Sequence, residues 1–155
     1  MAALTVILVL AHTGTAAAWL GGMLYSLLVV QPKAARFFGT DEETHEAFLA
    51  TMASGNRWKV LALMAVLAGT GGGLLAIGPT PDPVQMVLHV GEILLLVAAV
   101  GVFVHLSWRM WPRRVFALPG ERAKLRARFQ RAAYGLVALV GTAFVLGVVA
   151  SALSS

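Results

Sequence analysis

The chain has 155 residues, of which 59% are hydrophobic and only 12% are charged, so most of it must be solvated by lipid rather than by water. Its net charge of +5 comes from basic residues beside long apolar segments, a pattern that signals membrane topology and argues against nucleic-acid binding. Cysteine is absent, which excludes disulfides, thiolate metal sites, iron–sulfur clusters and covalently attached heme.

Four apolar segments are long enough to cross a hydrocarbon core of about 30 Å, which takes roughly 20 helical residues. They are residues 4–31, 58–78, 84–108 and 132–153. Each is predicted to be a helix, because an open sheet would leave backbone groups without partners in lipid. The predicted fold class is therefore all-α, an integral membrane up-down-up-down four-helix bundle that forms a single domain over residues 1–155.

The connections between these helices have patterns of their own. Residues 40–43, Thr-Asp-Glu-Glu, match a capping box and are followed by apolar residues at helical spacing, which predicts a short interfacial helix over 41–53. Residues 79–83 contain three prolines at alternate positions and predict a tight turn between antiparallel helices. The helix of the last span is predicted to begin early, near Glu121.

The basic residues predict the orientation of the bundle. All 12 lie in or beside the connections 32–57 and 109–131, so both connections are predicted to be cytoplasmic. Trp58, Trp108 and Trp111 accompany them, as expected for an aromatic belt at the interface. The sequence thus predicts a multi-pass protein of the cytoplasmic membrane with both termini on the outer side.

Ionisable residues inside a span are costly and usually face the interior of a bundle. His12 and His89 each lie 19 residues before the predicted cytoplasmic end of their helix, at Gln31 and Trp108. At 1.5 Å per residue both are about 28 Å above the cytoplasmic boundary. We therefore expect them to share one level in the outer part of the bundle, on diagonal helices.

Two imidazoles at one level favour a bis-histidine heme b, with His12 and His89 as axial ligands. Gly14 and Gly91 lie near this level and could leave space for the ring. The alternatives are histidines that bond across the bundle, and glycines that only let helices pack closely. Copper is the alternative cofactor. Met86 lies on the same stripe of its helix as His89, and its thioether would join the imidazoles of His12 and His89 as a copper ligand.

Three further residues complete the candidate set. Glu92, one turn from His89, is the only carboxylate within a span, and lipid favours its neutral form unless it is paired. It is a candidate for a contact to a histidine or for a proton relay, with a bond to a helix carbonyl as the alternative. His45 and His105 are expected to be structural or solvated, and would form a second site near the cytoplasmic face if both were ligands.

Three short motifs stand out along the chain: His12 with Trp19, Leu20, Gly21, Gly22 and Pro32; the run Asn56, Arg57, Trp58, Lys59; and Leu88, His89 with residues 94–97 and His105. They resemble motifs of two related families, the copper-resistance-D-like (CopD) membrane proteins and the HemJ-type protoporphyrinogen oxidases. The resemblance implies either a b-type heme on membrane histidines and porphyrin oxidation, or copper passage and delivery. Where those families place a lysine after the third-helix histidine, this chain has Gly91 and Glu92.

Three functional hypotheses follow from the sequence. The first is a membrane b-type heme protein in electron transfer or porphyrin redox chemistry, which could make it a HemJ-like oxidoreductase. The second is a copper transport or delivery protein that uses His12, Met86, His89 and Glu92. The third is a small accessory subunit of a larger respiratory-type membrane complex, or a homo-oligomer, whose glycine-rich faces pack against partners in the lipid bilayer.

Overall fold

The computed structural model describes residues 2–78 and 80–153, nearly all of which are helical. In chain order the elements are α1 (Ala2–Tyr25), the π-helix η1 (Ser26–Val30), α2 (Gln31–Phe38), α3 (Glu42–Ala53), α4 (Asn56–Ile77), α5 (Pro83–Val104), the π-helix η2 (His105–Met110), α6 (Trp111–Val115) and α7 (Pro119–Leu153). Pro79, which we predicted to belong to the turn, lies outside the described residues.

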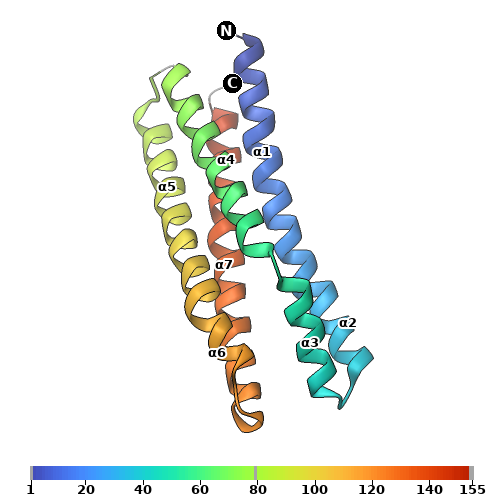
Figure 1. Cartoon of the computed structure of the whole chain (residues 1–155). Helices are drawn as coiled ribbons and strands as arrows, with labels where there is room; N and C mark the ends of the chain where they lie inside the picture. The colour runs from blue at the N-terminus through green and yellow to red at the C-terminus, as the bar shows by residue number, and fades with distance from the viewer. Residues whose placement is uncertain (1, 79, 154–155) are drawn as a thin grey trace.

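Four stretches are long and apolar enough to cross a membrane: Ala3–Phe38, Glu42–Ile77, Pro83–Arg113 and Gly120–Leu153. This confirms the all-α class and the four long apolar helices. Figure 1 shows the two ends of the chain at one end of the bundle and the connections α2–α3 and α6–α7 at the other. The connections with most of the basic residues therefore share one end of the molecule.

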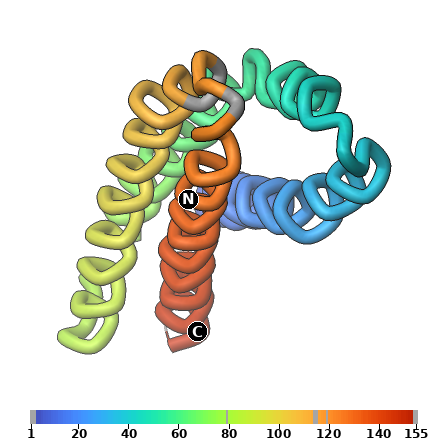
Figure 2. The backbone as a smooth tube through the Cα atoms, turned by 90° about the horizontal axis from the view of Figure 1, so that it is seen from below, coloured from blue at the N-terminus to red at the C-terminus, as the bar shows by residue number. Residues whose placement is uncertain are grey.

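The bundle consists of two closely packed helix pairs. α1 packs mainly against α4, and α5 packs mainly against α7, while the contact of α1 with α7 joins the two pairs. Figure 2 shows the α2–α3 segment displaced to one side of α5 and α7. α7 is the most buried of the four long helices and lies at the centre of the assembly.

The core lies toward the basic end of the bundle. Its buried members are Trp19, Leu67, Ala99, Phe103, Leu106, Leu136 and Val140. Trp19 and Leu67 are each only 4% exposed, and they bring α1 and α4 against the other pair. Among the described residues, few buried side chains lie at the opposite end, which holds the chain termini.

Helices 1 and 3 do not end at Gln31 and Trp108 as predicted, but run on past Pro32 and Pro112. In both cases a π-helix precedes the proline, and the residue just before it bonds five residues back: Gln31 N–H to the Ser26 carbonyl, and Trp111 N–H to that of Leu106. A proline ring clashes with the carbonyl four residues earlier in a regular α-helix. The wider π turn relieves this clash, so the helix continues.

Arg57 joins α4 to η2. Its Nη2 donates to the Ser107 carbonyl at 3.2 Å, and its guanidinium lies 4.7 Å from the centre of the Trp108 ring. The donor five residues after Ser107 would be Pro112, which has no N–H. Arg57 thus satisfies a carbonyl that the π-helix and the proline leave without a backbone donor.

The cap of α3 differs from the prediction by one residue. Asp41, not Thr40, is the N-cap, and its Oδ1 accepts from Thr44 N–H at 3.0 Å. Hydrogen bonds from the side chain and then the backbone of Thr44 lower the pKa of the Asp41 carboxyl. Further along α3, Glu46 forms an ion pair with Arg126 of α7 at 2.9 Å, which ties the α3 segment to the bundle.

α5 begins with a capping box that we did not predict from the sequence. The Asp82 carboxylate accepts from the backbone of Val84 and Gln85, and the Gln85 side chain accepts from Asp82 N–H. Pro83 occupies the first turn, where its missing N–H costs nothing. These contacts start α5 directly after the α4–α5 turn.

Candidate functional site

His12 is held on α1 by a side chain of α4. Its Nδ1 lies 2.9 Å from Thr70 Oγ1, and that hydroxyl lies 2.7 Å from the Val66 carbonyl. A hydroxyl has one proton, and the Val66 carbonyl can only accept, so Thr70 donates to Val66 and accepts from His12. In neutral His12 the proton is therefore on Nδ1, and the lone pair is on Nε2.

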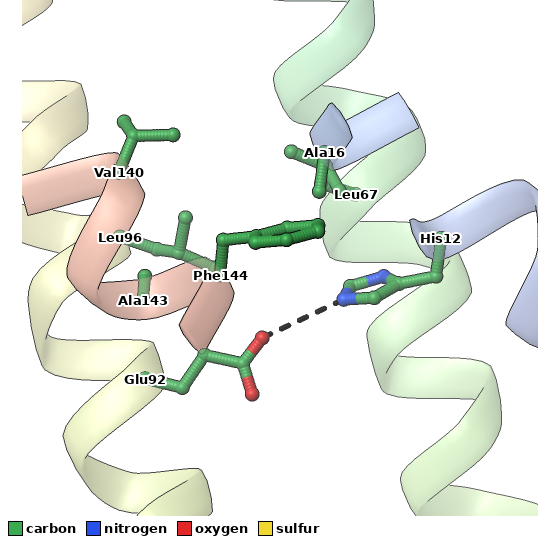
Figure 3. A pocket seen from close by; sticks show the side chains of 8 residues that line it. All are labelled: His12, Ala16, Leu67, Glu92, Leu96, Val140, Ala143 and Phe144. Carbon is green, nitrogen blue, oxygen red and sulfur yellow. Dashed lines mark ion pairs between the residues drawn. The ribbon is translucent and has the colours of Figure 1, made fainter. Parts of the chain in front are cut away.

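The free nitrogen of His12 faces Glu92 of α5. Nε2 lies 3.6 Å from Glu92 Oε1, and the two side chains are 20% and 17% exposed (Figure 3). The cavity beside them has a volume of about 20 Å³, which is the size of one water molecule. It is lined by His12, Ala16, Leu67, Glu92, Leu96, Val140, Ala143 and Phe144. All four long helices contribute side chains to this lining. The polar pair itself connects α1 of one helix pair with α5 of the other.

Two glycines allow this approach. A Cβ added at Gly71 would lie 3.1 Å from His12 Cε1, and one added at Gly147 would lie 3.0 Å from Glu92 Oε1. Both distances are shorter than ordinary carbon and oxygen contacts, so each glycine gives its polar partner room. Neither glycine stands out in the sequence, because glycines are common where membrane helices pack closely.

His89 lies one turn nearer the start of α5 than Glu92 and has a different hydrogen-bond partner. Its Nδ1 donates to the Gln85 carbonyl of the same helix at 2.6 Å, so Nε2 again has the lone pair. His89 is half-buried and does not line the cavity with His12 and Glu92. Met86 is 50% exposed on the same helix and is also outside that cavity.

The ligand atoms of the two histidines favour a heme, whereas the volume of the cavity opposes one. Both imidazoles bond an oxygen through Nδ1 and leave Nε2 for a ligand, as metal-binding histidines do. However, a cavity of about 20 Å³ does not hold a porphyrin. Gly14 has open space around it and lies at the surface of α1. A Cβ added at Gly91 would lie 3.4 Å from Leu146 Cδ1, so neither glycine opens onto a ring-sized interior space.

Copper also lacks an assembled set of ligands. In residues 2–78 and 80–153, no group of three or more His, Cys, Asp and Glu side chains is placed to hold a metal ion. His12 and Glu92 are the two predicted copper ligands that meet. His105 is exposed on η2, while His45 is buried on α3 and stacks on Phe38 at 5.6 Å, so the predicted second pair is divided between different surroundings.

Comparison of the chain with protein-family models, curated proteins and solved structures finds no match in any of the three. The site brings one imidazole, that of His12, and one carboxyl group, that of Glu92, within 3.6 Å of each other.

Replacement of Gly71 by alanine should disturb the His12 ring. We expect Gly71→Ala to lower the unfolding free energy in detergent by about 1–2 kcal/mol through overpacking. The matched control is Gly72→Ala, since Gly72 has nothing within 4 Å of an added Cβ. This control should be neutral or stabilising by up to about 1 kcal/mol from helix propensity. Equal effects of the two changes on thermal unfolding would contradict the contact with His12.

Proposed function

We propose that this chain is a multi-pass protein of the cytoplasmic membrane, an up-down-up-down bundle with both termini outside. The four long apolar helices support the membrane location. Figure 1 has the α2–α3 and α6–α7 connections at one end of the bundle, and most basic residues lie in these connections. By the positive-inside rule, 32–57 and 109–131 are then cytoplasmic. α3 lies at the inner interface in this arrangement.

The function that the geometry favours is proton exchange at a membrane-embedded acid–base site. The observation that carries it is the pair His12–Glu92, with His12 oriented by Thr70. Ionisable residues inside a span are costly and commonly mark proton relays. His12 acts as the base through Nε2, and Glu92 acts as the acid that donates to it.

Glu92→Gln should remove the carboxyl group of the pair without loss of the fold. In reconstituted protein, infrared difference spectra over a pH series should show a carboxylic acid C=O band that disappears in Glu92→Gln and shifts in His12→Ala. Glu121→Gln is the matched control, because Glu121 is an exposed carboxylate at the start of α7 and should leave the band unchanged. A band that is the same in His12→Ala and in the parent would remove the proposed coupling.

Heme b on His12 and His89 is the second candidate, and the available Nε2 atoms of both rings favour it. It would supply one-electron redox chemistry, with electron transfer or HemJ-like porphyrin oxidation as the reaction. The chain's own part would be to ligate through the two rings and to exchange a proton at Glu92. The enclosed volume opposes this candidate, so its test must detect the cofactor directly.

An absorbance spectrum with metal analysis of protein from heme-replete cells separates the candidates. Heme binding predicts a Soret band in the parent that His12→Ala and His89→Ala both lose. A colourless, copper-free protein in which the infrared band of the Glu92 carboxyl depends on His12 leaves proton exchange as the function. Stoichiometric copper without porphyrin absorbance, lost when both histidines are replaced, would instead establish the copper hypothesis.

We also propose that the chain assembles with a larger membrane complex or with further copies of itself. Gly14, Ala18 and Gly22 are exposed at intervals of four residues on α1. Such small-residue faces allow close packing of helices in lipid. A partner at this face is compatible with either cofactor candidate, since an accessory subunit can hold the site.

The orientation can be tested cleanly because the chain has no cysteine. Thr80→Cys in the α4–α5 turn should react with a membrane-impermeant maleimide added to intact cells. Thr40→Cys, between α2 and α3, should react only after the membrane is permeabilised; both threonines are exposed. Labelling of Thr40→Cys in intact cells would reverse the proposed topology.

A further inference from the structure

A basic pocket lies at the α6–α7 end of the bundle, far from His12. Its volume is about 440 Å³, and it is lined by Arg113, Phe116, Ala117, Glu121, Lys124, Leu125 and Arg128. The lining thus includes three cations, one carboxylate and several apolar side chains. This pocket takes no part in the proton chemistry proposed above.

The cations of this pocket are free to meet a ligand. Within the described part of the chain, the side chains of Arg113, Lys124 and Arg128 make no ion pair or hydrogen bond, and all three are exposed. Arg126 on the same helix differs, because it is neutralised by Glu46 and Glu42. The three cations of the pocket therefore outnumber its one carboxylate, that of Glu121, and the pocket keeps an excess of positive charge.

With the hydrocarbon core placed over the apolar segments, these cations lie at the level of the lipid phosphates. Arg128 precedes the apolar part of α7, which begins at Ala132, by four residues, or about 6 Å. Arg113 follows Trp108 by five residues, or about 8 Å along its helix. The headgroup layer extends roughly 5–7 Å beyond the hydrocarbon core on each side. Both guanidinium groups can therefore reach lipid phosphates.

We infer that this pocket binds the headgroup of an anionic phospholipid. Arg113 and Arg128 bind the phosphate, which suits the planar, multiply donating guanidinium. Lys124 adds a third charge, and Phe116 with Leu125 contacts the carbon backbone of the headgroup. Glu121 opposes doubly charged phosphate and so favours a singly charged phosphodiester such as that of phosphatidylglycerol.

Native mass spectrometry of the detergent-solubilised full chain tests this inference with phosphatidylglycerol and phosphatidylcholine as probes. The parent should bind phosphatidylglycerol more tightly than phosphatidylcholine. Arg128→Gln and, independently, Lys124→Gln should weaken the former by about fivefold or more. Arg131→Gln removes the same charge from the same helix outside the pocket, and should change binding by less than about twofold.

Three outcomes would overturn the inference. Equal weakening by Arg128→Gln and Arg131→Gln would mean general attraction to anionic lipid rather than a site. Equal affinity of the parent for the two lipids would mean no recognition of the headgroup charge. Displacement of bound phosphatidylglycerol by millimolar inorganic phosphate would assign the pocket to a soluble phosphate ligand instead of a lipid.

Discussion

The contact between His12 and Glu92 reflects the cost of polar groups in the apolar interior of the bundle. Burial of either His12 or Glu92 alone would cost free energy. Their contact between the two helix pairs lowers this cost for both side chains. Thr70 extends the arrangement by fixing the His12 ring. The polar pair thus adds to the packing of α1 against α7 a contact between α1 and α5.

The sequence predicts the coarse architecture well because lipid imposes it. Four apolar stretches and an uneven distribution of basic residues are enough for the spans and for a proposed orientation. The helix ends were harder, because Pro32 and Pro112 normally end helices and only a π turn shows that they do not. Likewise, Asp82 and Gln85 have the spacing of a capping box, but the neighbouring prolines predict only a turn.

The candidate site was predicted in part for the same reason. His12, His89 and Glu92 stand out as ionisable residues in apolar segments, so their selection needs no structure. Which of them meet does depend on structure: depth along a helix is known to about one turn, and His89 and Glu92 differ by just that turn. Thr70 and Gly147 are ordinary residues of membrane helices, and only the packing shows that they hold and admit the pair.

The bond between Arg57 and the Ser107 carbonyl has an evolutionary consequence. Arg57 is needed as a donor because Pro112 cannot supply one, so the two positions solve one local problem together. A related chain with an N–H at position 112 would be released from the requirement for a guanidinium at 57. Among divergent relatives, substitutions at these two positions, which are 55 residues apart in the sequence, should therefore occur together.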